Sequence, residues 1–325
     1  MNRTVLMMAL LLAGLPLGAA SAWASDTYPD KPVRFIVPYP AGGTTDLIAR
    51  GIGGKLAEKY GQQVVVDNRG GASTIIGTDL MAKSAPDGYT IGLITQTTMS
   101  INPNVIAKLP YDSVRDLAPI TQVVYFPYVI AAHPSAPFGT MKEMIAHARA
   151  KPGSITYGTP GTASTNHLGG VILEQMIGAK LLHVPFKGAG PALTAALGGQ
   201  VMTVITGAAT VIPQVKAGRI KVIAFASDKR HPNWPEIPST GEAGLKGFEA
   251  GTWFGIVTRS GVPRPIINTL NRDIIAALGQ PDLRGNLNAA GFDIRTQSPE
   301  EFARYMAEDR ALIGRVIKSA NITLD

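Results

Sequence analysis

The first third of the chain repeats one pattern three times, and this repeat constrains the fold more than any other feature. A short apolar run is followed by a turn of small and polar residues, and then by a helical segment. In the first unit Ile48, Ile52 and Leu56 share one helix face, and Asp46 is the expected N-cap. Strand, turn and helix in this order are typical of a parallel sheet covered by helices. The predicted strands are Val33–Tyr39, Val64–Val66 and Thr90–Thr95.

The second half of the chain continues the alternation. The segments Thr140–Glu143 and Ser298–Glu301 are capping boxes that mark helix starts. No long flexible linker is present, so we expect two α/β lobes with two extended crossings near Val123–Ala131 and Glu249–Val257. The pattern alone also permits a single large doubly wound sheet. The further predicted strands are Ile155–Tyr157, Leu181–Val184, Val201–Thr206, Lys221–Ala226 and Trp253–Thr258.

The N-terminus resembles a secretory signal peptide. Arg3 precedes an apolar run from Val5 to Ala20, and the sequence Ala22–Ala24 matches an A-x-A cleavage pattern. The run is shorter than the roughly 20 residues that a membrane span needs, although a retained anchor is the alternative. We therefore predict a signal peptide over residues 1–24, cleavage after Ala24 and a periplasmic location.

Composition indicates a globular protein without disulfides. Of the 325 residues, 45% are hydrophobic and 16% are charged, and there is no cysteine, which excludes disulfides, thiolate metal sites and cysteine nucleophiles. The 30 Lys and Arg residues outnumber the 23 Asp and Glu residues, which favours an anionic partner. The longest basic run is only Lys229–Arg230, so nucleic acid is not expected as a partner.

Signatures of catalysis are missing from the sequence. There is no G-x-S-x-G elbow, no P-loop, no H-E-x-x-H motif and no complete G-x-G-x-x-G motif. The five histidines show no metal-ligand spacing. We predict a protein that is not an enzyme and that uses neither a metal nor a cofactor.

Glycine and hydroxyl residues instead gather at strand-to-helix turns. Three such turns are Ala41–Thr44, Gly71–Thr74 and Gly158–Thr165. A turn of this kind directs backbone N–H groups and the positive end of a helix dipole at one point, which suits a carboxylate or a phosphate. Two turns in one lobe and one in the other predict an anion site in a cleft between the lobes.

The same turns carry a resemblance that covers the whole chain after the signal peptide. The segment Val37–Asp46 resembles the opening motif of the Bug-type substrate-binding proteins of the tripartite tricarboxylate transporter (TTT) system. Val66–Gly77 is similar to the second loop of that family, and Pro86–Ile120 follows its middle section. Tyr157–Gly188 looks like the signature of its second domain.

The resemblance implies a type II-like periplasmic binding protein fold, with two α/β lobes hinged by two crossing strands. One lobe would hold residues 25–124 and 250–325, and the other residues 125–249. It further implies a receptor that carries a small carboxylate to the membrane subunits of a transporter. The alternatives are a receptor that feeds a signalling system and a periplasmic enzyme that acts on a carboxylate. We expect a monomer, because a receptor of this kind must close freely. The ligand-binding residues that we expect are Tyr39, Gly43, Thr44, Gly71, Ala72, Ser73, Thr97, Thr98, Thr159, Ser164, Thr165 and Thr206.

Two departures from the family pattern bear on the ligand. Thr206 stands where relatives usually carry an aspartate, which favours a second acid group on the ligand over an amino group. Met99 replaces a frequent histidine, which favours an apolar middle unless Met99 belongs to the core. We therefore expect an aliphatic or aromatic dicarboxylate, such as terephthalate. For His167 a structural role is favoured over ligand contact, and for Lys187 a solvated position.

Overall fold

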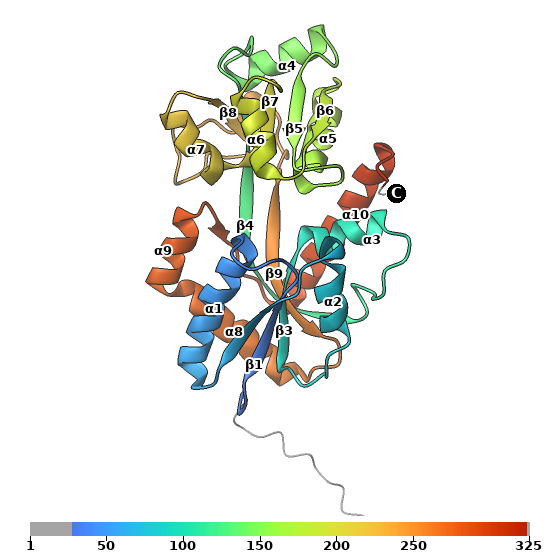
Figure 1. Ribbon diagram of the computed structural model, residues 1–325, viewed down its shortest axis with the longest axis vertical. Helices are drawn as coiled ribbons and strands as arrows, with labels where there is room; N and C mark the ends of the chain where they lie inside the picture. The colour runs from blue at the N-terminus through green and yellow to red at the C-terminus, as the bar shows by residue number, and fades with distance from the viewer. Residues whose placement is uncertain (1–27, 324–325) are drawn as a thin grey trace, which may run out of the picture.

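The computed structural model describes residues 28–323 and shows two lobes stacked along the long axis of the molecule (Figure 1). The strands β4 (Leu117–Ala132) and β9 (Gly251–Arg259) run between the lobes. The predicted signal peptide lies outside the described residues. Within residues 28–323, no helix is long and apolar enough to cross a membrane.

The lower lobe is built on a sheet of strand order β2-β1-β3-β9-β4, with a short strand β10 paired to β4. The three strands near the N-terminus are parallel, whereas β9 runs antiparallel to both β3 and β4. Their side chains are mostly aliphatic, as expected for strands covered on both faces. The remaining strands of this sheet are β1 (Val33–Val37), β2 (Val64–Asn68), β3 (Thr90–Thr95) and β10 (Asp293–Ile294).

Helices cover both faces of the lower sheet and enclose two apolar cores. One core lies between α1, α8 and the sheet and includes Phe35, Ile52 and Leu270. The other lies under α10 and includes Trp253 and Phe302. The helical segments of this lobe are α1 (Thr44–Tyr60), η1 (Ala72–Thr74), α2 (Ile75–Ala82), the π-helix η2 (Thr97–Ile101), α3 (Asn102–Val105), α8 (Arg264–Gly279), α9 (Pro281–Ala289) and α10 (Pro299–Ser319).

The upper lobe has its own sheet, of order β4-β7-β5-β6, with β8 also paired to β4. Strand β5 is parallel to both of its neighbours. The elements of this lobe are α4 (Met141–Ala150), β5 (Thr156–Thr159), α5 (Thr165–Ile177), β6 (Leu182–Pro185), α6 (Ala189–Leu197), β7 (Thr203–Gly207), α7 (Ala208–Lys216), β8 (Lys221–Phe225) and η3 (Gly241–Ala243).

Strand β4 is common to both sheets. Its part up to Pro127 pairs with β9, and its part from Tyr128 onward pairs with β7 and β8. The chain returns to the lower lobe through Ala250, whose carbonyl accepts from the Tyr128 amide at 2.9 Å. Both crossings lie in the predicted segments, so that prediction is confirmed. The chain forms two lobes rather than one doubly wound sheet.

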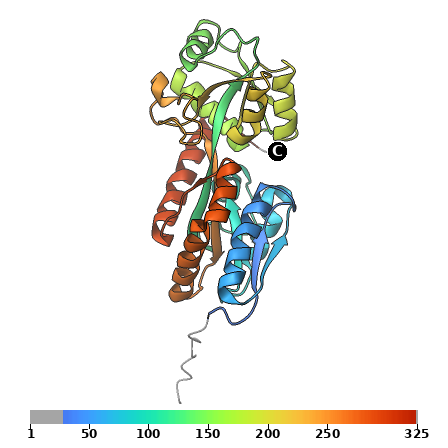
Figure 2. The same ribbon diagram turned by 90° about the vertical axis from the view of Figure 1, so that its left-hand side faces the viewer.

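The helix α10 lies alongside the crossing strands and reaches the upper lobe (Figure 2). Near its C-terminal end Ile313 and Ile317 share an apolar cluster with Leu168 and Val171 of α5 and with Ile101 of η2. The two lobes therefore make apolar contact beside the crossing strands.

Most predicted elements appear, and one predicted cap is wrong. In both capping boxes the Thr140 and Ser298 side chains accept from the backbone three residues on, as predicted. Helix α1, however, begins after Gly43 and not at Asp46. Asp46 occupies the third helical position, and its carboxylate reaches back to the Gly42 amide at 2.9 Å. From the third helical position, a short acidic side chain can accept a hydrogen bond from an amide that precedes the helix. The helix therefore begins one turn earlier than predicted.

Candidate ligand-binding site

A cavity of about 540 Å³ lies between the lobes and is the candidate site; we call it the front cavity. The lower lobe contributes the turn after β1 and the residues on either side of Gln96, and the upper lobe contributes the first residues of α5 and α6. The crossing strands form its floor. Its lining consists of Tyr39, Pro40, Ala41, Gly43, Thr44, Thr45, Thr95, Thr97, Tyr128, Thr165, Ala189, Thr252 and Phe254.

Three helices begin at the front cavity. Thr44, Thr165 and Ala189 are the first residues of α1, α5 and α6, and each lines the cavity. The first turn of a helix has unpaired N–H groups and the positive end of the helix dipole. At α1 and α6 the N-cap is glycine and no side chain caps the helix. These N–H groups are therefore available to an anion at α1 in the lower lobe and at α6 in the upper lobe, whereas at α5 the Ser164 side chain accepts from the His167 amide.

Hydroxyl groups complete the lining. It holds six threonines and two tyrosines, and none of its residues carries a charged side chain. The Tyr39 hydroxyl lies 2.8 Å from Thr95 Oγ1, and the Tyr128 hydroxyl lies 2.5 Å from Thr165 Oγ1. Burial raises the pKa of both tyrosines above the ordinary value, so both hydroxyls keep their protons at neutral pH. The cavity offers donors without a fixed negative charge.

The turn after β1 is held from behind by an ion pair. Asp46 Oδ2 accepts from the Gly42 amide and from Arg50 Nε, each at 2.9 Å. The hydrogen bond from Arg50 is the largest cause that lowers the pKa of the Asp46 carboxyl. Because Arg50 pairs with Asp46, the carboxylate near the start of α1 is compensated by a cation.

The structure brings five of the predicted binding residues together at the front cavity. They come from three separate segments, and only the sequence motifs and the resemblance had connected them. These residues are Tyr39, Gly43, Thr44, Thr97 and Thr165.

The predicted second loop lies against η2 rather than along this cavity. Ala72, Ser73 and Thr74 have left-handed backbone angles, and Gly71 precedes them. The Ser73 carbonyl accepts from Asn102 Nδ2 at 2.6 Å, and Thr98 Oγ1 donates to Thr74 Oγ1 at 3.2 Å.

The remaining predicted residues of the upper lobe use their side chains inside the lobe. Thr159 is fully buried and its Oγ1 lies 2.6 Å from His183 Nε2. Ser164 caps α5 and donates to the Gly161 carbonyl at 2.7 Å. Thr206 is buried in β7, opposite Val129. None of the three is part of the front cavity lining.

Three further residues singled out in the sequence have structural positions. His167 Nδ1 accepts from the Ala163 amide at 3.2 Å, and its ring stacks on that of His183 with 3.8 Å between centroids. Lys187 is exposed. Met99 is buried in the lower core beside Ile94, so of the two alternatives for this residue the core position is confirmed. A methionine in that core fills space and does not report on the ligand.

Sequence reasoning missed several lining residues on the crossing strands. Tyr128 of β4 and Thr252 and Phe254 of β9 face the cavity. These residues could have been found as the polar and aromatic residues within the two segments that were predicted to cross between the lobes. Ala189 was also missed, although it follows Gly188 at the start of a helix and thus resembles the other two turns.

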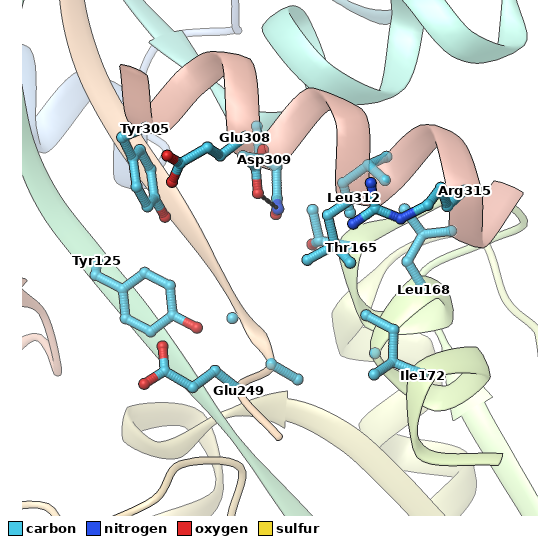
Figure 3. A pocket seen from close by; sticks show the side chains of 15 residues that line it. Tyr125, Thr165, Leu168, Ile172, Glu249, Tyr305, Glu308, Asp309, Leu312 and Arg315 are labelled. Atoms are coloured by element: carbon cyan, nitrogen blue, oxygen red, sulfur yellow. Dashed lines mark hydrogen bonds between the residues drawn. The ribbon is translucent and has the colours of Figure 1, made fainter. Parts of the chain in front are cut away.

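A second cavity, the rear cavity, lies on the opposite side of the crossing strands. Its volume is about 370 Å³, and it is lined by Tyr125 and Gly251, which alternate along β4 and β9 with the front-cavity residues Tyr128 and Thr252. Figure 3 shows α10 along one wall and α5 along the other. Its lining includes three carboxylates and one cation, Glu249, Glu308, Asp309 and Arg315.

The two cavities differ in the charge that they can accept. Carboxylates around the rear cavity would repel an acidic ligand, whereas helix N-termini and hydroxyls line the front cavity. The front cavity is therefore the candidate site for a carboxylate. Within residues 28–323, no group of three or more His, Cys, Asp or Glu side chains is placed to hold a metal ion.

Comparison with known proteins identifies the family of this chain. Residues 48–322 match the TctC model, described as the tripartite tricarboxylate transporter family receptor. A UPF0065 protein from the tcbD–tcbE intergenic region of Pseudomonas sp. strain P51 is 35% identical over 298 residues, covering 90% of this chain and 88% of that protein. Protein BugT of Bordetella pertussis is 32% identical over 310 residues, covering 95% of each chain.

Solved structures of similar sequence share the fold. A protein of R. palustris solved with adipate is 32% identical, with a TM-score of 0.77, and the match covers 91% of this chain and 99% of that one. MatC of Rhodopseudomonas palustris, solved with bound malate, is 28% identical, with a TM-score of 0.73 and coverage of 89% and 100%. The chain belongs to the TctC family of tripartite tricarboxylate transporter receptors, which are solute-binding proteins and not enzymes.

Proposed function

We propose that this protein is a periplasmic receptor that binds a small dicarboxylate in the front cavity and delivers it to the membrane subunits of a tripartite transporter. The observation that supports this most directly is the meeting of three helix N-termini, from both lobes, at one uncharged and hydroxyl-rich cavity. Such a site stabilises negative charge on a ligand through backbone N–H groups and helix dipoles.

Two opposed sets of donors fit a ligand with an acid at each end. Helix α1 lies on the lower side of the cavity, and α5 and α6 lie on the upper side. Relatives solved with adipate and with malate bind dicarboxylates of this kind. The rings of Tyr39, Tyr128 and Phe254 also line the cavity and suit an apolar middle, aliphatic or aromatic. Terephthalate is therefore one member of the proposed ligand class.

The proposed motion is closure of the two lobes on the ligand. Residues 25–124 with 250–325, and residues 125–249, are proposed to move as two units about the crossing strands. Closure would exclude water from the hydrogen bonds to the carboxylates and strengthen them. The receptor is proposed to act as a monomer, because free closure needs no second copy.

The experiment is calorimetric titration with a panel of adipate, malate, terephthalate, benzoate and several amino acids. A dicarboxylate is expected to bind without chemical change, and at 100 times its Kd to stabilise the protein by about 2.7 kcal/mol. Binding of an α-amino acid and of no dicarboxylate would refute the proposal.

A matched pair of variants tests the site. Thr165→Asp adds a carboxylate at the first residue of α5, where acidic residues favour a helix, so folding is expected to be retained. It should raise the Kd of the dicarboxylate by about 100-fold through like-charge repulsion. Thr165→Asn has nearly the same shape without the charge and should raise the Kd by less than about 10-fold. Equal effects of the two variants would place the ligand elsewhere.

A further inference from the structure

The carboxylate of Asp309 joins α10 to two other elements of the lower lobe, η2 and β9. Its Oδ1 accepts from Gln96 Nε2 at 2.7 Å, and its Oδ2 accepts from Trp253 Nε1 at 3.0 Å and from the hydroxyl of Ser100. Figure 3 shows Asp309 on the face of α10 that lies toward the crossing strands. All three donors are neutral, and no ion pair to Asp309 is found among residues 28–323.

Asp309 is buried, so the charge on its carboxylate depends on the three hydrogen bonds that it accepts. Removal from water raises the pKa of the Asp309 carboxyl, and the three hydrogen bonds oppose that effect. Hydrogen bonds to a charged group are stronger than those between neutral groups. Asp309 therefore holds its three partners more firmly than an uncharged acceptor would.

Two of the three donors, Gln96 and Trp253, are neighbours in sequence of residues that line the front cavity, and the third belongs to the same π-helix as Thr97. Gln96 precedes Thr97, and Ser100 belongs to the same π-helix, η2. Trp253 lies between Thr252 and Phe254 on β9, and alternation along the strand places those two side chains on the cavity face. One carboxylate behind the sheet thus connects the η2 wall and the β9 wall of the cavity.

We propose that Asp309 is a positioning residue that fixes the η2 wall of the front cavity relative to the crossing strand β9. The proposal rests on the proposed function, because it gives Asp309 a role in binding through residues that line that cavity. One turn further along α10, Ile313 lies in the apolar cluster with Leu168 and Val171 of the upper lobe. The same helix therefore contacts the upper lobe and orients two walls of the cavity in the lower lobe.

Asp309→Asn tests this role, with Asp273→Asn as a matched control. Asp273 is also a buried aspartate of the lower lobe, 1% exposed, but it pairs with Lys59 and Arg272 at the far end of α1. In hydrogen exchange of the ligand-free protein, Asp309→Asn should speed exchange of residues 96–101 and 252–254 at least 10-fold. Asp273→Asn should leave these segments unchanged. Unchanged exchange in Asp309→Asn would overturn the proposal.

Two further readouts separate positioning from general stability. Asp309→Asn should raise the Kd of the dicarboxylate at least 10-fold, whereas Asp273→Asn should lower the melting temperature without changing the Kd. In the chain that begins at Ser25, with Trp234 replaced by phenylalanine, the emission of Trp253 should shift in Asp309→Asn only. An equal loss of melting temperature in both variants, with an unchanged Kd, would show Asp309 to be structural only.

The outcomes remain informative if a variant or the proposed function fails. Should Asp309→Asn not fold, Gln96→Ala and Ser100→Ala each remove one donor and should speed exchange of residues 97–101 at least 3-fold; no change would overturn the proposal. Should the unaltered protein bind no carboxylate, the proposed function fails. The exchange result for the ligand-free protein still decides whether Asp309 fixes the two walls.

Discussion

The hydroxyl of Tyr128 lies 2.5 Å from Thr165 Oγ1, and this contact joins the strand shared by both sheets to the first residue of α5. Both residues line the front cavity. The contact therefore sets the position of one helix N-terminus against the floor of the proposed binding site. It lies at the point where the β4 strand passes from the lower sheet to the upper one.

Replacing Tyr128 with phenylalanine should weaken binding more than folding. The change removes one buried hydrogen bond, which is expected to reduce the free energy of unfolding by about 1 kcal/mol. The Kd of the dicarboxylate should rise by about 5-fold to 10-fold, because a donor is lost and α5 is less constrained. Tyr157→Phe is the control, because no hydrogen bond of that hydroxyl is found among residues 28–323 and Tyr157 does not line the front cavity, so the Kd should not change. Titration calorimetry and urea unfolding provide the two numbers.

Gly251 at the start of β9 should not tolerate a side chain. A Cβ at this position would lie 2.6 Å from the backbone oxygen of Phe126 and 2.4 Å from the Tyr125 hydroxyl. Gly251→Ala should therefore reduce the free energy of unfolding by about 1–3 kcal/mol. Gly54→Ala, in the exposed middle of α1 with no atom within 4 Å, should increase it by up to about 1 kcal/mol. Denaturant unfolding of both variants checks the pair, and a neutral Gly251→Ala would contradict the packing described for the crossing.

Stability should fall as the pH is lowered from about 6.5 towards about 4. Burial lowers the pKa of His167 and of His183 to about 4, below the ordinary value of 6.5, so the unfolded chain binds protons in this range before the folded chain does. The histidines are neutral when folded, and their contribution to stability is fully present above pH 6.5. Urea unfolding at pH 7.5 and pH 5.0 should show the loss.

The histidine pair provides its own control for this pH dependence. His183→Gln removes one of the two titrating groups and should make the slope between pH 6.5 and pH 5 shallower. An unchanged slope in this variant would assign the effect to carboxylates elsewhere in the chain.

Asp46→Asn should loosen the turn after β1. The neutral amide keeps an acceptor for the Gly42 N–H but loses the charge that pairs with Arg50. We expect a loss of about 1 kcal/mol in the free energy of unfolding, because the hydrogen bond from the Gly42 amide then goes to a neutral acceptor. The Kd of the dicarboxylate should rise by about 3-fold to 5-fold. Glu58→Gln breaks an exposed pair on the same helix and should leave both quantities unchanged, as thermal unfolding and calorimetry can show.

The elements were predictable because their signals are local. Alternating runs gave the strand positions, and the capping boxes at Thr140 and Ser298 gave helix starts, since each depends on residues only a few positions apart. Asp46 was assigned to the wrong cap position because an acidic residue favours either the cap or the first turn, and the backbone of Gly43 decides between them.

The direction of individual hydroxyls was not predictable from the sequence. Thr159 and Thr206 lie at the ends of strands, as binding residues do, yet packing in the upper lobe buries both of them. Thr252 lies on a crossing strand whose cavity face is fixed only by its register with β4. A register shift of one residue would exchange the side chains on the front and rear faces of the strand. The face on which Thr252 lies is therefore set by strand pairing and not by the local sequence.

The three helix N-termini have a consequence for the empty receptor. Each carries a partial positive charge, and those of the upper lobe face that of the lower lobe across the front cavity. Without a ligand these like charges would repel one another and would oppose the proposed closure of the lobes. A bound dicarboxylate would attract the helix N-termini of both lobes, so the ligand would hold the lobes together electrostatically. A membrane partner that distinguishes the closed form from the open form would then recognise the ligand-bound receptor.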